Sequence, residues 1–186
     1  MRDYIREYIG RLEQGLRAID PDLIELVAKI LEGARREQRA VFIIGNGGSA
    51  ATASHMANDL QKLASEGKDH SYRAIALSDN VPLLTAWAND ADYEEVFLRQ
   101  LMALAREGDL LIAITGSGNS RNIVRAVEWA KDAGLKTIAF LGFDGGKIAE
   151  LADHALVFRE GHYGRIEDAH MVLEHMISNY LHSLSE

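Results

Sequence analysis

Four side chains in two segments of the sequence have types and spacings that suit proton transfer or cation binding. His55 and Asp59 are four residues apart in a helix-like segment, which places them on one face of that helix. Glu167 and His175 are eight residues apart in the last helix-like segment, so they fall on roughly the same side. If the pairs meet, they hold a divalent cation such as Zn²⁺ or perform acid–base chemistry without a metal. A His–Asp pair at this spacing is also common on ordinary helix surfaces, so spacing alone leaves all three interpretations open.

Two glycine-rich loops suit a second kind of chemistry, the binding of an anion. Residues 45–49 read Gly-Asn-Gly-Gly-Ser and residues 115–120 read Thr-Gly-Ser-Gly-Asn-Ser, each between an apolar run and a helix-like segment. Glycine allows close backbone approach, and the free amides at the following helix N-terminus favour a phosphate. Such loops also serve only to turn the chain and cap a helix, but two of them at strand ends favour phosphate binding. The candidate substrate contacts are Asn46, Gly47, Gly48, Ser49, Thr115, Gly116, Ser117, Asn119 and Ser120.

Two other phosphate-binding motifs fit the sequence poorly. Gly45, Gly47 and Ala50 satisfy the permissive form of the dinucleotide fingerprint. The acidic residue that this fingerprint needs should end the second strand, but that strand ends at 77–78, and Asp69 lies before it. The Gly-x-x-x-x-Gly-Lys-Ser/Thr loop of nucleoside triphosphatases does not occur in the sequence. We therefore expect neither a nicotinamide cofactor nor a nucleoside triphosphate.

The elements that must position these residues alternate between strands and helices. Short apolar runs predict strands at 40–45, 72–77, 109–114, 136–142 and 154–159. Amphipathic patterns predict helices at 1–19, 22–38, 49–63, 78–87, 92–106, 121–134 and 164–184, with a short helix within 143–152. This alternation predicts an α/β fold, a three-layer αβα sandwich around a five-stranded parallel sheet. Both glycine-rich loops then lie at the carboxyl ends of strands, where such sheets bind ligands.

Composition sets the class of protein. A chain of 186 residues, 47% of them hydrophobic, suits one globular domain at 1–186, and no apolar run reaches the roughly 20 residues that span a bilayer. Zero cysteines exclude disulfides and thiolate metal sites. The net charge of −8 without a basic cluster argues against nucleic acid as a partner. We expect a cytoplasmic protein without membrane partners, in which helices at 1–38 pack on the core or on a neighbouring subunit.

Four blocks of the sequence resemble the phosphoheptose isomerases of the sugar-isomerase (SIS) domain family. They are GNGGSAATASH…DL from residue 45, ALSDNVPLLTAWANDADYEEVF from residue 76, GDLLIAITGSGNSRNIVRAVEWAKDAGLKTIAFLGFDGG from residue 108, and RIEDAHMVLEH from residue 165. Their order and spacing match from about residue 25 to residue 182. The resemblance implies a flavodoxin-like SIS fold and a homotetramer with active sites at subunit interfaces. It also implies isomerisation of sedoheptulose 7-phosphate to D-glycero-D-manno-heptose 7-phosphate, a step of heptose biosynthesis.

The resemblance assigns roles to individual residues. In that family a carboxylate on the helix after the first loop and a histidine on the last helix move the protons, and these match Asp59 and His175. The same two residues, an earlier histidine and a glutamine bind a zinc ion. Carried over, the ligand set is His55, Asp59, Glu167 and His175, with Glu167 also a substrate contact. The family's Asn-Asp pair matches Asn89 and Asp90 as further substrate contacts.

Four positions depart from the family pattern. The catalytic glutamate is Asp59 here, the glutamine ligand is Glu167, an arginine is replaced by Leu63, and a hydroxyl residue of the second loop is Gly116. Aspartate still offers an oxygen base and ligand, and the extra carboxylate of Glu167 should strengthen cation binding, so isomerisation through an enediol(ate) is retained. The identity of the sugar phosphate stays open. A non-catalytic SIS module that binds a sugar phosphate for regulation is the competing class, and the presence of Asp59 and His175 favours the enzyme.

Overall fold

The protein, described here by a computed structural model over residues 1–184, is built on one sheet; Ser185 and Glu186 lie outside the described part. Within that part the sheet has five strands in the order β2-β1-β3-β4-β5, and every pairing is parallel. The strands are β1 (Ala40–Gly45), β2 (Arg73–Ala76), β3 (Leu110–Thr115), β4 (Lys136–Gly142) and β5 (His154–Phe158). The expected α/β class with a five-stranded parallel sheet is confirmed.

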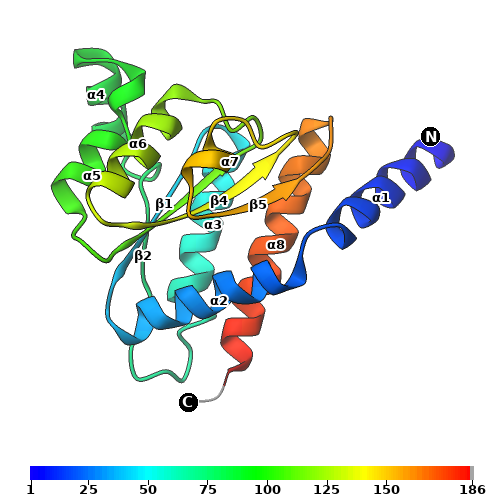
Figure 1. Cartoon of the computed structure of the whole chain (residues 1–186), viewed down its shortest axis with the longest axis horizontal. Helices are drawn as coiled ribbons and strands as arrows, with labels where there is room; N and C mark the ends of the chain where they lie inside the picture. Colours follow the sequence, from blue (N-terminus) through cyan, green and yellow to red (C-terminus); the bar gives the residue numbers. More distant parts are fainter. Residues whose placement is uncertain (185–186) are drawn as a thin grey trace.

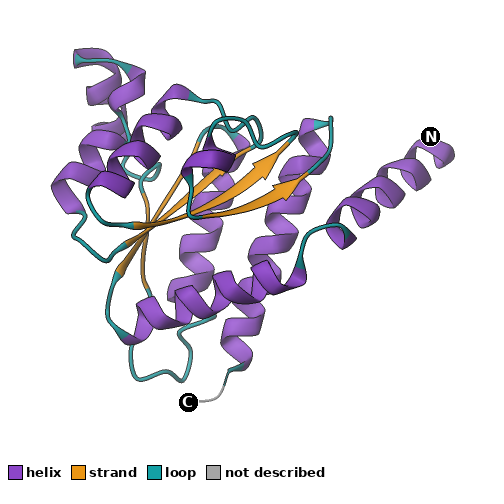
Figure 2. Cartoon of the chain, viewed as in Figure 1, coloured by secondary structure: helices purple, strands orange, loops and turns teal. Residues whose placement is uncertain are grey.

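Helices cover both faces of this sheet (Figure 1, Figure 2). One face contacts α2 (Pro21–Arg36), α3 (Gly48–Gln61) and α8 (Tyr163–Ser183), and Val41 and Ile43 of β1 point toward it. The other face contacts α5 (Leu98–Leu104), α6 (Arg121–Asp132) and α7 (Ile148–Leu151), and Phe42 and Ile44 point toward that one. Successive side chains of a strand enter opposite layers, so β1 is apolar throughout because both its faces are buried. Among residues 1–184, no helix has both the length and the apolar character needed to cross a bilayer.

The order of the strands places a switch point between β1 and β3. From β1 the chain proceeds to β2 on one side, and it then returns to β3 on the other side of β1. The register pairs Gly45 at the end of β1 with Ile114 near the end of β3, so the two strands end side by side. The glycine-rich loops 45–49 and 115–120 therefore begin next to each other, at the place where open parallel sheets bind ligands.

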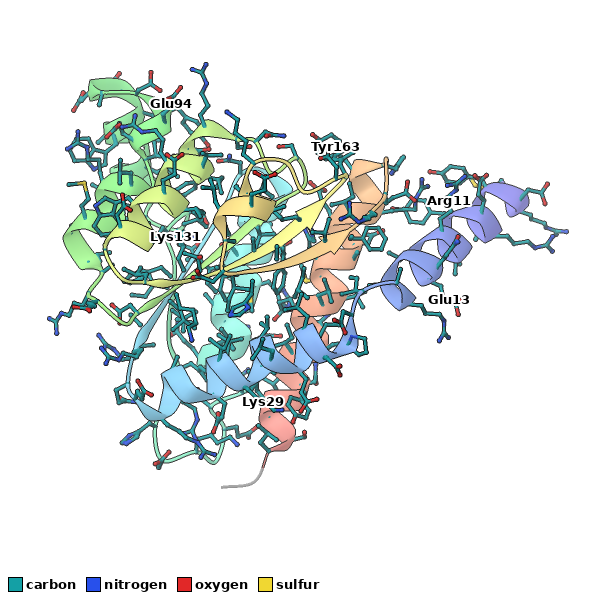
Figure 3. The ribbon with its side chains drawn as sticks, in the orientation of Figure 1. Arg11, Glu13, Lys29, Glu94, Lys131 and Tyr163 are labelled. Carbon is teal, nitrogen blue, oxygen red and sulfur yellow. The ribbon has the colours of Figure 1, made fainter. Side chains whose placement is uncertain are left out.

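The first helix, α1 (Arg2–Arg17), extends away from the rest of the molecule (Figure 1). Figure 3 shows Arg11 and Glu13 pointing outward from it, and no residue of α1 is buried in the described structure. Its apolar residues Tyr4, Ile5 and Ile9 are 56%, 47% and 58% exposed. α2, by contrast, buries one side against the sheet. The two N-terminal helices therefore differ, because α2 is anchored on its own chain and most of α1 is left uncovered.

The segment before β3 differs from the single helix expected at 92–106. After α4 (Val81–Asp90) the chain forms a 3₁₀ turn, η1 (Tyr93–Glu95), and then α5. Asp92 accepts a hydrogen bond from the amide of Glu94, which starts the turn. Val96 and Phe97, which join η1 to α5, are both fully buried. Neighbouring side chains of a regular helix point about 100° apart, and the break lets both enter the core.

Candidate functional site

α3 and α8 lie side by side on one face of the sheet and bring two predicted histidines together (Figure 1). Nε2 of His55 and Nε2 of His175 are 3.1 Å apart, and the ring planes meet at 74°. Their side chains are 43% and 46% exposed, so a ligand from solvent can reach both. Two such nitrogens either share one proton between neutral rings or direct both lone pairs at a common cation.

Carboxylates complete the cluster from both helices. Oδ2 of Asp59 lies 3.5 Å from Nε2 of His55, one helical turn away as the spacing predicts. Oε2 of Glu174 lies 3.5 Å from Nε2 of His175. One ligand atom from each of these side chains lies within 4.8 Å of all the others. We call His55, Asp59, Glu174 and His175 the histidine–carboxylate cluster.

The donor atoms of the cluster fit a divalent cation. Zinc ligands lie about 2.0–2.2 Å from the metal, so neighbouring ligands of a tetrahedral site are about 3.3–3.6 Å apart. The 3.1 Å between the imidazoles and the 3.5 Å between each imidazole and its carboxylate are close to that separation. Two neutral imidazoles and two carboxylates also balance the charge of a divalent ion. The cluster therefore suits a four-coordinate metal with nitrogen and oxygen ligands.

The two carboxylates of the cluster stand in different surroundings. Asp59 is partly exposed, and its Oδ1 accepts a hydrogen bond from Nδ2 of Asn58 at 2.9 Å. Glu174 is fully buried; its Oε1 accepts from the Ser178 hydroxyl at 3.0 Å, and its Oε2 has no hydrogen-bond partner among residues 1–184. Burial raises the pKa of the Glu174 carboxyl above its usual value, the Ser178 hydrogen bond lowers it, and the Asp59 carboxylate raises it. A cation would offset the free-energy cost of burying this charge.

Glu167, which the sequence predicts as a metal ligand and substrate contact, lies at the other end of the site. Its carboxylate faces the start of α3, because a Cβ added at Gly48 would meet Oε1 of Glu167 at 2.6 Å. In the described chain Glu167 does not join the histidine–carboxylate cluster. Its role as a ligand stays a prediction.

A third histidine, His170, also lies on α8 but serves the core. It is 1% exposed and packs against the ring of Phe140. Burial lowers the pKa of His170 to about 4, so the ring is neutral at physiological pH. The five-residue spacing predicts that His170 and His175 point in different directions, and one ring is indeed buried while the other is half-exposed.

The two glycine-rich loops each lead into a helix N-terminus, as a phosphate site requires. Gly47 has a φ of 56° and precedes the first residue of α3, and Ser120 precedes the first residue of α6. The Ser120 hydroxyl makes no capping hydrogen bond within the described chain, so it can donate to a ligand. Oγ of Ser117 accepts a hydrogen bond from the Asn119 amide at 3.3 Å, which leaves its own hydrogen for a ligand. Side-chain hydroxyls and the backbone amides at the helix N-termini can therefore both donate hydrogen bonds to an anion.

The second loop is held in shape by the turn that follows β4. Gly118 has a φ of 62°, and a Cβ there would lie 1.9 Å from the carbonyl oxygen of Gly145. Nδ2 of Asn119 donates to the carbonyl of Ser117 at 2.9 Å, and its Oδ1 accepts from the Lys147 amide at 3.1 Å. Asn119, a predicted substrate contact, therefore supports the loop that carries Ser117.

The remaining predicted contacts lie on the first loop and on α4. Nδ2 of Asn46 donates to Asn122 of α6 at 2.9 Å, and the Tyr93 hydroxyl donates to Oδ1 of Asn46 at 3.0 Å. Asn46 therefore ties the first loop to α6 and η1. Asn89 and Asp90 are exposed and hydrogen-bond to each other at 2.7 Å. Their role in substrate binding stays a prediction.

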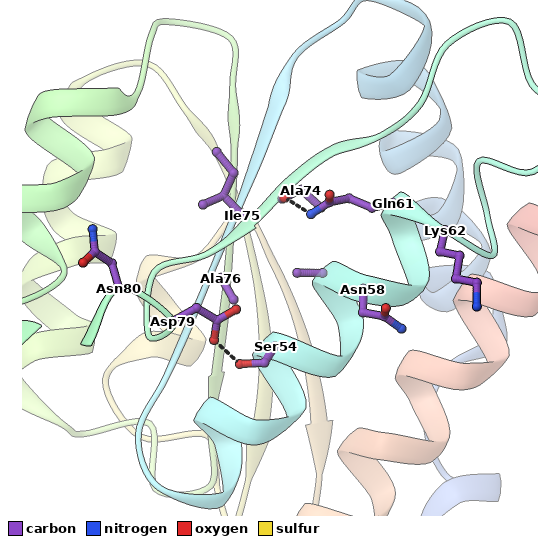
Figure 4. Close-up of a pocket in the computed structure, with 10 residues that line it drawn as sticks. Ser54, Asn58, Gln61, Lys62, Ala74, Ile75, Ala76, Asp79 and Asn80 are labelled. Atoms are coloured by element: carbon purple, nitrogen blue, oxygen red, sulfur yellow. Dashed lines mark hydrogen bonds between the residues drawn. The ribbon is translucent and has the colours of Figure 1, made fainter. Parts of the chain in front are cut away.

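An open groove of about 810 Å³ borders α3 without including the cluster (Figure 4). Ser54 and Asn58 of α3 line it, together with Ile75 of β2 and Asp79 beyond that strand. None of the four cluster residues is among the described residues that line this groove. It exposes β2, the strand at the edge of the sheet, and it is therefore distinct from the site of the histidines.

Two residues that sequence reasoning did not single out stand at the site. Glu174 joins the cluster, and a signal for it exists, since His170, Glu174 and Ser178 recur every four residues and form a buried polar row in α8. Tyr163 begins α8, and a Cβ at Gly116 would meet its ring at 3.0 Å (Figure 3). The tyrosine ring thus lies where the family resemblance places a hydroxyl side chain, and only the fold brings the two positions together.

Comparisons with known proteins agree on one family. A family model described as SIS domain matches residues 3–142. A phosphoheptose isomerase from Chlorobaculum tepidum is 40% identical over 172 residues, covering 91% of this chain and 82% of the relative. One from Helicobacter pylori strain P12 is 41% identical over 169 residues, covering 89% and 85%. The solved structure of a phosphoheptose isomerase from Neisseria gonorrhoeae is similar with a TM-score of 0.89 and 32% identity, over 98% of this chain and 97% of that one.

Proposed function

The chain belongs to the SIS domain family, and from this membership we propose that it is an aldose–ketose isomerase of a phosphorylated sugar. The relatives are named phosphoheptose isomerase, so the substrate that we assign is sedoheptulose 7-phosphate and the product is D-glycero-D-manno-heptose 7-phosphate. The observation that carries the proposal is the meeting of Asp59 and His175 from two helices, one of which starts at a glycine-rich loop.

Asp59 and His175 divide the proton transfers. Aldose–ketose interconversion removes a proton from the carbon beside the carbonyl and returns one to the neighbouring carbon, through an enediol(ate). We assign the carbon-bound proton to Asp59, which is close to the two imidazoles and partly open to solvent. His175 exchanges protons with the substrate oxygens, because its half-exposed ring can both donate and accept. Proton transfers by positioned groups accelerate such steps by about 10²–10⁴-fold.

The phosphate is held at the far end of the sugar by the two loops. Amides at the starts of α3 and α6, with the hydroxyls of Thr115, Ser117 and Ser120, supply the donors. Gly47, Gly48 and Ser49 supply the first loop's share, while Asn46 and Asn119 keep the loops in place. Binding energy from this remote group orients the reacting carbons against Asp59.

We also propose that the cluster binds one zinc ion per subunit, held by His55, Asp59 and His175. When bound, zinc supplies Lewis-acid polarisation of the substrate carbonyl. The support is that the separations of 3.1 Å between the imidazoles and 3.5 Å between His55 and Asp59 are close to those of a tetrahedral site. His55 has no other assigned part in the reaction, so its contribution is to metal binding. Glu167, at the first loop, then faces the substrate.

The active form is proposed to be a cytoplasmic homotetramer with its sites at subunit interfaces. The support is the uncovered apolar surface of α1 and the apolar groove of about 390 Å³ between α2 and α8, lined by Ile24, Met176 and Tyr180. Such surfaces on a small protein are usually covered by a partner. A second copy of the chain is the partner that we assign.

The experiment that tests the function is a panel of ketose phosphates of five to seven carbons, incubated with the purified chain and followed by NMR. We expect conversion of sedoheptulose 7-phosphate to the aldose phosphate, and suppression of that conversion by a metal chelator. Binding of every sugar phosphate without conversion of any would contradict the enzyme and support the regulatory module.

Gly116 supports an alternative assignment, in which the isomerase acts on a different sugar phosphate. The position lacks the hydroxyl of the family pattern, and the Tyr163 ring stands against it. The Tyr163 ring narrows the site at this position, and Gly116 offers no hydroxyl to donate a hydrogen bond. Both changes affect which sugar fits more than they affect the proton transfers at Asp59. The same panel decides, since preferred conversion of a shorter ketose phosphate would replace the heptose assignment and leave the isomerase in place.

A further inference from the structure

Glu174 is the member of the histidine–carboxylate cluster to which neither spacing nor family resemblance gives a role. It is 0% exposed, and the Ser178 hydroxyl donates to its Oε1 at 3.0 Å. Its Oε2 has no hydrogen-bond partner within residues 1–184 and lies 3.5 Å from Nε2 of His175. A buried carboxylate with one unsatisfied oxygen is costly unless a positive group pairs with it. Glu174 contributes one ligand atom to the cluster, in which all four such atoms lie within 4.8 Å of one another.

We propose that Glu174 is the fourth protein ligand of the divalent cation, beside His55, Asp59 and His175. This inference rests on the metal-assisted isomerase proposed above and adds a ligand to it. One ligand atom of Glu174 lies within 4.8 Å of those of the other three residues, so adjustment of the side chains alone brings all four onto one cation. Ser178 is a positioning residue, because its hydrogen bond to Oε1 fixes Oε2 toward the cation.

The geometry favours Glu174 over Glu167 for this task. Glu167 comes seven residues earlier on α8, which is about 10 Å along a helix axis. Its carboxylate lies against Gly48 at the start of α3. To join the imidazoles Glu167 would have to move away from Gly48, whereas Glu174 already lies beside them. The two carboxylates of α8 therefore have separate tasks, one at the cation and one near the phosphate loops.

The test measures the affinity of the metal-free chain for Zn²⁺ by competition with a chromophoric chelator, with no substrate present. The variants are Glu174→Gln, the matched control Glu167→Gln, and Ser178→Ala. We expect Glu174→Gln to lower the affinity by about 100-fold and Ser178→Ala by about 10-fold, since loss of ligands and of their supporting contacts weakens metal sites by such factors. Glu167→Gln should stay within about threefold of the wild type.

Each other outcome counts against the proposal. Wild-type affinity in Glu174→Gln, or a loss confined to Glu167→Gln, overturns Glu174 as the ligand and leaves the isomerase and its metal intact. If the wild-type chain does not bind Zn²⁺, both the role of Glu174 as a ligand and the metal site of the proposed function are wrong. The isomerase activity itself is still tested by the panel of ketose phosphates.

A structural measurement keeps the proposal testable if the Glu174→Gln chain fails to fold. The amide has the same shape, so we expect circular dichroism and melting of the metal-free variant to match the wild type. If they do not, crystals of the zinc-loaded wild type show the ligands directly by anomalous scattering. Density with Oε2 of Glu174 about 2.0–2.2 Å from the zinc supports the proposal, and coordination by Glu167 in its place refutes it.

Discussion

At the scale of single residues, Asp59 is the side chain that we assign as the base of the proposed isomerase. Its Oδ2 lies 3.5 Å from Nε2 of His55, and its Oδ1 accepts a hydrogen bond from Asn58, so its carboxylate is held beside the imidazole. Asp59→Asn removes the base and a charged ligand while preserving shape. We expect kcat to fall by about 10²–10⁴-fold with little change in the melting temperature. The measurement is the rate of ketose phosphate conversion.

The matched control at this position is Asp59→Glu, which restores the residue that the family pattern has. A carboxylate one methylene longer keeps the chemistry, so activity should be retained within about tenfold of the wild type if the site adjusts. An undiminished rate in Asp59→Asn would remove Asp59 from the mechanism.

The sequence could predict part of the cluster because helical spacing is local. His55 and Asp59 are four residues apart on one helix, and the structure has them one turn apart at 3.5 Å. Which residue of α8 meets them is not local, because it depends on how that helix is rotated against α3. Glu167 and Glu174 are seven residues apart on that helix, and only the packing of α8 on the sheet distinguishes them.

At the scale of elements, the shape of the second loop depends on Gly118. Its φ of 62° disfavours any other residue, and a Cβ would lie 1.9 Å from the carbonyl oxygen of Gly145. We expect Gly118→Ala to displace the loop and destabilise the fold by roughly 1–3 kcal/mol. Binding of sugar phosphate, followed as the rise in melting temperature, should weaken at the same time.

Gly10→Ala in α1 is the control for this substitution. A Cβ at Gly10 meets nothing within 4 Å, and alanine favours a helix, so stability should be unchanged or higher. If Gly118→Ala binds sugar phosphate as tightly as Gly10→Ala does, the second loop is not the phosphate site.

The bounds of some strands were predictable from their apolar runs. The runs 40–45 and 136–142 form β1 and β4 with those bounds, whereas the strand expected at 109–114 is shifted by one residue, to Leu110–Thr115. The run 92–106 has a helical pattern, but the structure breaks it at Val96 and Phe97, which both enter the core. The hydrophobic pattern of one segment does not show where the neighbouring helices and strands that bury its side chains will lie.

At the scale of the whole molecule, a buried ionic network joins α2 to the chain before β2. Glu32 accepts hydrogen bonds from Arg35 at 2.9 Å and from the Tyr72 hydroxyl at 3.0 Å. Hydrogen bonds from Arg35, and then from Arg36 and Tyr72, outweigh the effect of burial and lower the pKa of the Glu32 carboxyl from 4.5 to about 2. A carboxyl whose folded pKa is depressed contributes stability above its unfolded pKa, and this contribution is lost as the pH falls from about 4.5 to about 2.

Substitution of Glu32 should expose this pH dependence. Glu32→Gln cannot carry the charge, so we expect a loss of about 3 kcal/mol in the free energy of unfolding at pH 7. The difference from the wild type should shrink as the pH falls below about 4.5. Glu13→Gln is the control, because its pair with Arg17 is exposed and such pairs contribute little. Urea unfolding between pH 7 and pH 3 measures both, and a difference that does not change with pH would contradict the assignment.

The uncovered apolar face of α1 is a candidate contact surface between subunits. Ile5 and Ile9 are 47% and 58% exposed on a helix that extends from the body, and an apolar stripe of this kind is stable in water when another copy covers it. We expect light scattering of the wild type to give the mass of a tetramer, about four times the 20.6 kDa of one chain.

Ile9→Asp places a charge in the apolar stripe and should reduce that mass. Gln14→Asp adds the same charge on the opposite, exposed face of α1 and should leave the mass unchanged. Because the proposed sites lie between subunits, isomerase activity should fall with the mass. A wild-type monomer with full activity would show that His175 and Asp59 work without a neighbouring chain.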